Sequence, residues 1–312
     1  MGVLTALGRR LLQVLLTVVI VALLIFGLMR LLPGDPALTL LGDRATDVQI
    51  VAMQHKLGLD EPMLFQFGQF LLHTVTLQLG DSITLRVPVS RLIVDGLPIT
   101  MLLTAMAAIL ALLMAVPLAF IGALRPNGWA DAIIRVIAQI SLSMPVFYIG
   151  LVLLITLAAG LHLFPVGGIG AGFFEDLYYL FLPAMTLALS LAAVLLRNLR
   201  QSLAEVLNAE YVGFAVAKGL PPRLILGRHV LRNAIISTVT LLGLNMGTLV
   251  GGAVITESVF AIPGIGRLLI DSIFARDYPV VQGLSMVLAV MVSLVFLLTD
   301  TIQALLDPRL AR

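Results

Sequence analysis

The feature that most constrains this chain is a series of apolar stretches, each long enough to cross a lipid bilayer as a helix. Residues 11–29, for example, carry no charge and would extend over about 28 Å as an α-helix. Backbone groups in lipid must be hydrogen-bonded within the spanning segment, and these stretches are too long and continuous for barrel strands. The sequence therefore predicts an all-α polytopic membrane protein with six transmembrane helices, near residues 9–31, 98–124, 133–160, 177–196, 235–257 and 280–305.

The composition agrees with a membrane protein and argues against a soluble domain. Of the 312 residues, 60% are hydrophobic and only 12% are charged. The first apolar stretch follows Arg9 and Arg10, as in a secretory signal, but it ends in "MRLLPGDPA" and not in a small-residue cleavage pattern. We therefore expect a retained first span.

Basic residues predict the orientation. With the N-terminus in the cytoplasm, most of the 19 Lys and Arg residues fall in cytoplasmic segments, and most of the others lie in one long first loop, where the positive-inside rule has little force. The short loop 161–176 contains no Lys or Arg. Both termini are expected on the cytoplasmic side.

The spans divide the chain into four parts. Residues 1–31 form the first helix, 32–97 an external segment, 98–306 a core of five spans and 307–312 a cytoplasmic tail. Within the external segment, Asp47 and Gly58 bracket one expected helix, and Asp60-Glu61-Pro62 opens another.

Catalytic and metal-binding chemistry finds little support. The chain has no cysteine, and its four histidines are scattered without metal-ligand spacing. No phosphate-binding G-x-x-x-x-G-K-[ST] loop is present, so this chain is expected to bind no cofactor, and ATP and magnesium would bind elsewhere. Ser141 and Ser143 have no histidine placed in a span to activate them, which makes a membrane enzyme a distant alternative. A self-contained carrier or channel is disfavoured because the span interiors carry almost no carboxylate or histidine.

The loop 197–234 interrupts the apolar pattern. From Leu199 to Phe214 apolar residues recur every three or four positions, which predicts one helical stripe. Gly219 supplies a C′ position for that helix, and Pro221-Pro222 prevent continuation while allowing a second short helix to begin. The expected product is a helix–turn–helix elbow. Two interpretations stay open, a solvated positive-inside loop and a docking surface for a cytosolic partner.

At this point the sequence resembles a known family. "EYVGFAVAKGL" followed by "LRNA" resembles the EAA loop of binding-protein-dependent ABC importer permeases. Further stretches resemble the first, B-type, permease subunit of the dipeptide, oligopeptide and nickel importers: "GRRLLQVLLTVVIVALLIFGLMRLLPGDPA", "LGLDEPMLFQFGQFL" with "LGDSI", "GGAVITESVFAIPGIGRLLIDSIFARDYPVVQ" and "ALLDPRL". The resemblance extends from about residue 9 to 310.

The resemblance implies a type I ABC importer permease fold in the bacterial cytoplasmic (inner) membrane. It further implies pairing with a second, C-type permease, binding of two cytoplasmic ATPase subunits and delivery of substrate by an external (periplasmic) binding protein; nothing points to nucleic acid. Peptides are the expected substrate, with nickel or metal chelates, glutathione and opine-like solutes as alternatives.

The same resemblance implies roles for particular residues. Glu210, Ala215 and Gly219 occupy the E, A and G positions of the loop, which in the family is a coupling helix seated in a cleft of the ATPase. The residues expected to form this ATPase-coupling loop are Glu210, Tyr211, Ala215, Lys218, Gly219, Arg223, His229, Arg232 and Asn233.

Side chains along the translocation path are assigned more loosely. Pro145 should kink the third span, next to polar or adaptable side chains, and the fifth span carries similar groups. Glu257, at the outer end of span five, either contacts an external protein or accepts hydrogen bonds from the 258–267 turn. The residues assigned to the path are Ser141, Ser143, Met144, Asn245, Met246 and Thr248.

Overall fold

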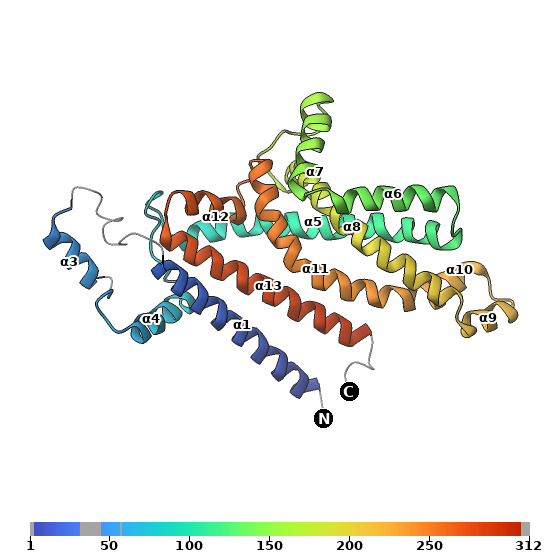
Figure 1. The fold of residues 1–312 in the computed structure, drawn as a ribbon, viewed down its shortest axis with the longest axis horizontal. Helices are drawn as coiled ribbons and strands as arrows, with labels where there is room; N and C mark the ends of the chain where they lie inside the picture. The colour runs from blue at the N-terminus through green and yellow to red at the C-terminus, as the bar shows by residue number, and fades with distance from the viewer. Residues whose placement is uncertain (1–2, 32–44, 57, 307–312) are drawn as a thin grey trace. The chain divides into compact units, whose positions relative to one another are not determined.

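The computed structural model of the protein describes residues 3–31, 45–56 and 58–306 (Figure 1). Every regular element in these ranges is helical, in agreement with the all-α prediction, and the only strand-like pairing described there is an isolated bridge between Asp81 and Pro88. The predicted tail 307–312 lies outside the described residues. The chain divides into two compact units, Met1–Pro98 with Leu268–Leu294, and Ile99–Arg267 with Val295–Arg312.

Four helical segments in the described ranges are long and apolar enough to cross a membrane. They are α5 (Val89–Leu124), α8 (Phe173–Leu207), the continuous helix Pro222–Val259 and the stretch Tyr278–Gln303 of α13 (Tyr278–Leu306). The helices α6 (Trp129–Ser143) and α7 (Val146–Leu153), the latter continued by the π-helical η1 (Leu154–Gly160), form a fifth span if the bent pair is counted as one. Helix α1 (Val3–Leu31) covers the first predicted span, and its apolar part, Leu12–Leu28, is shorter than the others.

In the first unit, the expected helices of the external segment are present. Helix α3 (Asp47–Lys56) begins at Asp47, and α4 (Met63–Val75) follows Pro62. Helix α4 contacts α1 through aromatic rings: Phe26 lies 5.5 Å from Phe67 and 6.0 Å from Phe70, centroid to centroid. This contact gives the external segment an apolar attachment to the first helix.

A buried carboxylate, that of Asp277, joins two distant segments of the first unit. Asp277 accepts hydrogen bonds from the Ser82 hydroxyl and from the backbone N–H groups of Ile83 (3.2 Å) and Thr84 (3.1 Å). Because the Asp277 side chain is buried, these donors replace the water that it loses. The segments "LGDSI" and "ARDYP" therefore meet in the folded unit, although they lie far apart in the sequence.

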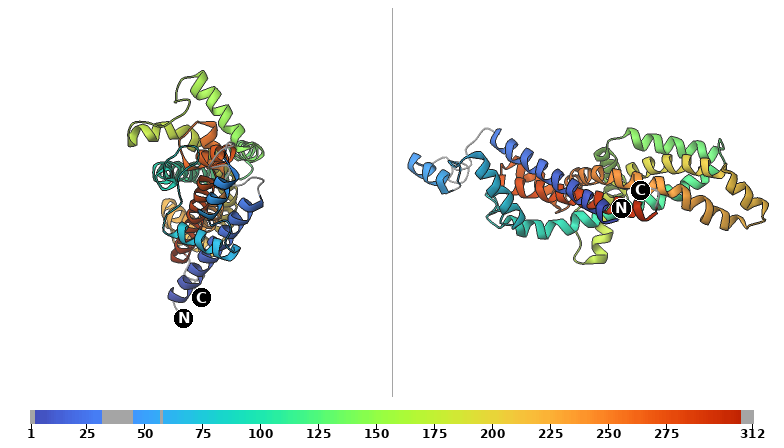
Figure 2. Two further views of the ribbon diagram at one scale, coloured as in Figure 1. Left: turned by 90° about the vertical axis from the view of Figure 1, so that its left-hand side faces the viewer. Right: turned by 90° about the horizontal axis from the view of Figure 1, so that it is seen from below.

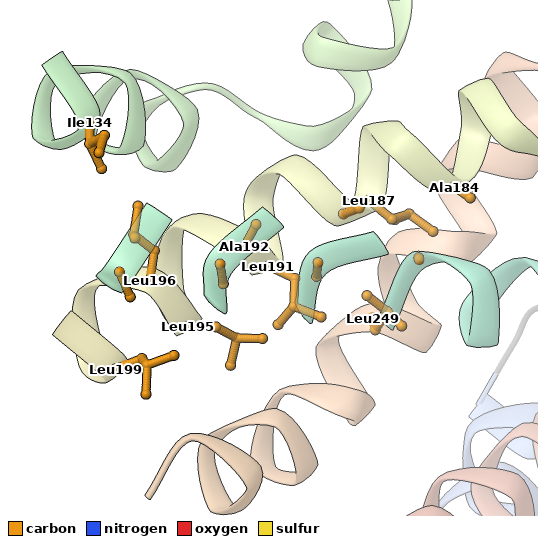
Figure 3. Packing of buried hydrophobic residues seen from close by; sticks show 14 of the residues in the cluster. Ile134, Ala184, Leu187, Leu191, Ala192, Leu195, Leu196, Leu199 and Leu249 are labelled. Atoms are coloured by element: carbon orange, nitrogen blue, oxygen red, sulfur yellow. The ribbon is translucent and has the colours of Figure 1, made fainter. Parts of the chain in front are cut away.

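Helix α8 is the centre of the second unit. It packs against α6, α7 and the helix α11 (Arg232–Val259) (Figures 1 and 2). In the most apolar 18-residue stretch of α8, 67% is buried, whereas the corresponding share for α5 is 33%. Its leucines pack in one buried cluster with small residues of α5, a helix that has an alanine at every fourth position along its buried side (Figure 3). Small side chains allow helices to approach closely. The buried stripe of α5 is Leu103, Ala107, Ala111, Ala115, Ala119 and Ala123.

One further helix was not expected from the sequence, and two expected helices are longer than predicted. The connection between the fifth and sixth predicted spans, for which no helix is predicted from the sequence, contains the helix α12 (Ile265–Phe274). The predicted spans also understate the helices, because α5 begins nine residues before the predicted start at residue 98 and α8 extends beyond both ends of 177–196. Hydropathy marks the part of a helix that is apolar, and not its polar extensions.

Candidate elbow and its supporting contacts

The segment after α8 forms an elbow, which we define as α9 (Glu210–Ala217), the turn 218–221, α10 (Pro222–Leu224) and the π-helical η2 (Ile225–Leu231). The elbow lies at one end of α8 (Figure 2). The predicted continuous stripe from Leu199 to Phe214 is wrong, because α8 ends at Leu207. The Asn208 amide donates to the carbonyl of Ala204 (2.8 Å) and competes with the helical backbone, and Ala209 is extended with ψ at 141°.

The turn after α9 has the hydrogen bonds of a Schellman motif. Gly219 has a φ of +72°, its N–H donates to the carbonyl of Val216 (2.9 Å), and the N–H of Leu220 donates to the carbonyl of Ala215 (3.3 Å). This confirms the C′ position predicted for Gly219. The carbonyls of Val216 and Ala215 are thereby satisfied within a turn that needs a left-handed residue.

The second limb of the elbow is the beginning of a membrane helix. Pro221 is the N-cap of α10 and Pro222 its first residue, as the sequence predicts. The expected second short helix does not end, however: α10, η2 and α11 run on as one helix, Pro222–Val259. Movement of the elbow would therefore act directly on a candidate span.

One face of the elbow is packed inward. Val212 and Ala215 are buried and belong to the same hydrophobic cluster as Leu203 of α8. Val230, in the second limb, joins this cluster. Among the predicted coupling residues, Ala215 thus has a packing role, and a larger side chain there would displace α9 from its support.

The other face of the elbow exposes apolar and basic side chains. Phe214 is 68% exposed and Val216 61%, on the same helix as the exposed Tyr211. The Asn233 amide donates to the Tyr211 hydroxyl (3.2 Å) and to the carbonyl of His229 (2.7 Å), which ties α9 to the second limb. The elbow and the first residue of α11 also carry exposed charged side chains: Glu210, Lys218, Arg223, Arg228 and Arg232.

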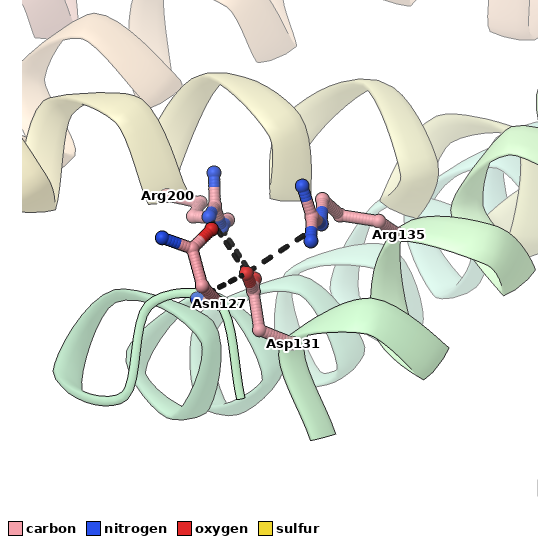
Figure 4. Close-up of polar contacts among 4 residues, drawn as sticks. All are labelled: Asn127, Asp131, Arg135 and Arg200. Carbon is pink, nitrogen blue, oxygen red and sulfur yellow. Dashed lines mark hydrogen bonds and ion pairs between the residues drawn. The ribbon is translucent and has the colours of Figure 1, made fainter. Parts of the chain in front are cut away.

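An ion pair with a buried carboxylate joins the end of α8 that precedes the elbow to α6, and the sequence did not predict it. The Arg200 guanidinium donates from Nε to Oδ1 of Asp131 (2.7 Å) and from Nη2 to Oδ2 (2.9 Å), while the N–H of Asn127 donates to Oδ2 (3.1 Å) (Figure 4). The Nε atom of the more exposed Arg135 lies 3.5 Å from Oδ2 of Asp131. An acidic residue in the first turn of α6 was visible in the sequence, but nothing in the sequence indicates which distant arginine it meets.

The residues assigned to a translocation path lie on two elements. Ser141, Ser143 and the C-cap Met144 are at the end of α6, and Ser143 donates to the carbonyl of Gln139 (2.9 Å). On α11, Asn245 donates to the carbonyl of Leu241 (2.8 Å) and Thr248 to that of Asn245 (2.7 Å); Met246 lies between them. These polar groups bond within their own helices, and their place on a path stays a prediction.

The structure favours the hydrogen-bonding role of Glu257 over an external contact. The side chain is completely buried. Its carboxylate accepts from the Thr100 hydroxyl (2.6 Å) and from the N–H of Arg267 (2.9 Å), while the Thr100 oxygen accepts from the N–H of Ile265 (3.1 Å). Glu257 therefore joins α5, α11 and the first turn of α12, and it does not present its carboxylate to a partner.

Family comparisons cover nearly the whole chain. Residues 111–312 match the family described as "Binding-protein-dependent transport system inner membrane component". Residues 3–104 match its N-terminal companion, "Binding-prot-dependent transport system membrane comp, N-term".

Relatives with similarity along nearly their whole length include two transport proteins. The oligopeptide transport system permease protein AppB of Bacillus subtilis is 35% identical over 296 residues, covering 93% of this chain and 94% of the relative. The glutathione transport system permease protein GsiC of Salmonella choleraesuis is 36% identical over 301 residues, covering 96% of each.

Solved structures share the fold at low sequence identity. The inward-facing MetNI methionine ABC transporter matches with a TM-score of 0.57 and 18% identity, covering 69% of this chain and 96% of that one. An amino acid ABC transporter crystallised with histidines matches with a TM-score of 0.52 and 16% identity, covering 70% and 94%.

Proposed function

This chain belongs to the family of binding-protein-dependent transport system inner membrane components, and on that premise we propose that it is a permease subunit of an ATP-driven importer. It forms half of a translocation pathway for di- or oligopeptides. Relatives named as oligopeptide and glutathione permeases, each similar along almost its whole length, support this assignment. Catalysis of ATP hydrolysis belongs to other subunits, which bind ATP and magnesium.

The proposed assembly contains four kinds of component. A second, C-type permease completes the pathway, two cytoplasmic ATPases supply the energy, and an external binding protein delivers the substrate. The family description, which refers to dependence on a binding protein, supports the last of these partners. The chain resides in the bacterial inner membrane as a multi-pass protein.

We further propose six spans with both termini in the cytoplasm. Helix α1 and the bent pair α6 with α7 then each count as one span, in addition to the four long apolar helices. In this orientation the elbow lies in the cytoplasm, and Leu163 to Val166, in the loop without basic residues, lie outside.

The observation that carries the proposal is the exposed face of the elbow. Phe214 and Val216 extend from α9 without being buried by the described chain, and the same elbow carries the exposed basic residues Lys218, Arg223 and Arg228. Exposed apolar side chains on a short helix fit a protein groove, because burying them there removes apolar area from water. A helix seated in an ATPase cleft could then pull directly on the span that begins at Pro222.

Replacing Phe214 by Ala tests this docking role. The loss of an aromatic anchor should weaken copurification of the ATPase subunits with the tagged chain by about tenfold, since such anchors dominate interface energetics. Because Phe214 is 68% exposed, the free energy of unfolding should change by less than about 0.5 kcal/mol. Phe174→Ala, at an exposed phenylalanine near the start of α8, is the matched control and should retain the ATPases.

The same preparation separates the alternatives. Normal ATPase binding and peptide uptake by Phe214→Ala would contradict the docking role. Uptake by the purified chain alone, without partners, would instead support a self-contained carrier. The GsiC similarity favours glutathione as the second candidate substrate, and competition of labelled tripeptide uptake by glutathione distinguishes a shared pathway from a peptide-specific one.

A further inference from the structure

The stem of the elbow, which we define as residues 197–207 of α8, is hydrogen-bonded to neighbouring helices on two sides. On the first side, the fully buried Asp131 of α6 holds the Arg200 guanidinium through two parallel bonds of 2.7 and 2.9 Å (Figure 4). Two bonds between planar groups fix orientation as well as distance. Rotation or sliding of the stem against α6 would break both.

The surroundings of this pair leave little space for another arrangement. Asp131 also accepts the N–H of Asn127, which closes the turn between α5 and α6. A Cβ atom added to Gly122 of α5 would lie 3.0 Å from Oδ1 of Asp131 and 3.2 Å from Nε of Arg200. Three helices therefore converge on one ion pair, and an Asp131 separated from Arg200 would lose both of these charged hydrogen bonds in a buried position, with only Arg135 left as a charged partner.

On the opposite side, the stem is bonded to α11 through short polar side chains. The hydroxyls of Ser202 and Ser237 lie 2.8 Å apart. The side-chain oxygen Oδ1 of Asn198 accepts from the Ser237 hydroxyl at 3.2 Å and from the Thr238 hydroxyl at 3.4 Å. These neutral bonds are weaker and more easily exchanged than the charged pair, so the two sides of the stem differ in stiffness.

We propose that the Asp131–Arg200 pair is a rigid link that makes the stem and α6 move together when the elbow is displaced. The proposal rests on the function assigned to the elbow. Displacement of α9 is then transmitted through α8 to α6, whose far end is the break before α7, as well as through the second limb to α11. Asp131 and Arg200 are positioning residues in this scheme, since neither contacts substrate or nucleotide.

The link can be tested in the complete importer, reconstituted with its partners and assayed with a labelled tripeptide that the wild-type complex takes up. Asp131→Asn and Arg200→Gln should each lower the number of peptides transported per ATP hydrolysed by about fivefold or more, because coupling between sites is lost. The double variant should lose no more than either single one, since both remove the same interaction. Arg197→Gln is the matched control: it removes the same charge from an exposed position on the same stem and should leave the ratio unchanged.

A distance measurement reads out the link without relying on transport. The chain has no cysteine, so Val136→Cys on α6 and Glu205→Cys on the stem accept spin labels at two exposed sites when the partner subunits are cysteine-free. The wild-type complex should give one narrow distance distribution with and without a non-hydrolysable ATP analogue. Adding Asp131→Asn should broaden it.

The outcomes separate this inference from the proposed function. If the ATPases bind and the Asp131 and Arg200 variants transport as many peptides per ATP as Arg197→Gln, the link is overturned while the importer assignment stands. If these variants do not assemble, the wild-type distances decide, because a distribution that broadens or splits with nucleotide shows that the stem and α6 move independently. Failure of the wild-type chain to bind ATPases would instead contradict the function itself.

Discussion

At the scale of single residues, Gly219 sets the geometry of the elbow. Its φ of +72° lies in the left-handed region, and no neighbouring atom lies within 4 Å of the position a Cβ would take. A side chain there is therefore opposed by backbone conformation and not by crowding. Replacement of Gly219 by a residue that tolerates the left-handed region should therefore have little effect, whereas replacement by a β-branched residue should disturb the turn.

Gly219→Val should uncouple ATP hydrolysis from transport while the protein remains inserted. A β-branched residue in the left-handed region costs about 1–3 kcal/mol, which favours opening of the turn and a displaced α9. Gly219→Asn is the control, because asparagine tolerates this conformation, and it should retain most of the coupling. The measurement is substrate-stimulated ATPase activity in the reconstituted importer; equal stimulation in both variants would show that the turn geometry is unimportant.

The buried carboxylates show what the sequence leaves undetermined at this scale. Asp131, Glu257 and Asp277 each accept hydrogen bonds from segments distant along the chain. The role of Gly219 could be predicted because a turn depends on adjacent residues. For Glu257 the sequence anticipated hydrogen bonds from the 258–267 turn, which include the N–H of Arg267. It did not indicate Thr100, because that partner depends on how α5 lies against α11 in the folded chain.

At the scale of elements, the break between α6 and α7 is the largest departure from a regular span. The two helices are bent by 109° at Pro145. Met144 is extended with φ at −92° and ψ at 132°, as expected for a residue before proline, and Pro145 caps α7. The sequence predicted the kink, and the structure shows a complete interruption of the helix.

Pro145→Ala should partly straighten this element. Alanine restores the backbone N–H and removes the steric restriction on Met144, so a continuous helix becomes accessible. Spin labels at the exposed positions Ile137 and Leu151 report the change, because their Cα atoms would be about 21 Å apart in an unbroken helix. An unchanged distance would mean that packing of α7 against α8, and not the proline, maintains the bend.

Helix boundaries were predictable only where residues with special backbone preferences mark them. The starts of α3 and α10 were recognised from Asp47 and from Pro221-Pro222. The end of α8 at Leu207 was not, because the apolar spacing continues past Asn208 and suggests one helix. Competition by the Asn208 side chain is a weak local signal, and the spacing of apolar residues overrode it in the prediction.

At the scale of the whole molecule, hydropathy predicts the organisation into spans, and the distribution of basic residues predicts the orientation. The four long apolar helices and the bent pair correspond to five of the six predicted spans. The position of α8 at the centre of its unit was not predictable, since α5 and α8 are both strongly apolar. The sequence of α5 differs in having an alanine at every fourth position, a pattern typical of a helix that packs closely against another helix.

The proposed orientation makes a prediction about accessibility. Single cysteines at Ala217, in the elbow, and at Val166, in the loop before α8, provide unique labelling sites in a chain without native cysteine. In intact cells lacking the ATPase subunits, a membrane-impermeant maleimide should label Val166→Cys and leave Ala217→Cys unmodified until the membrane is permeabilised. Labelling of both from the same side would reverse the topology and remove the elbow from the ATPases.

The contact between Ser82 and Asp277 has a consequence for biosynthesis. The two residues are separated by 195 positions, so the early loop lacks its carboxylate acceptor until most of the chain has left the ribosome. At translation rates of about 5–20 residues per second, that delay is roughly 10–40 s. During this interval the Ser82 hydroxyl and the N–H groups of Ile83 and Thr84 lack their acceptor and must bond to water or to a chaperone. A chain truncated before Asp277 would never acquire that acceptor.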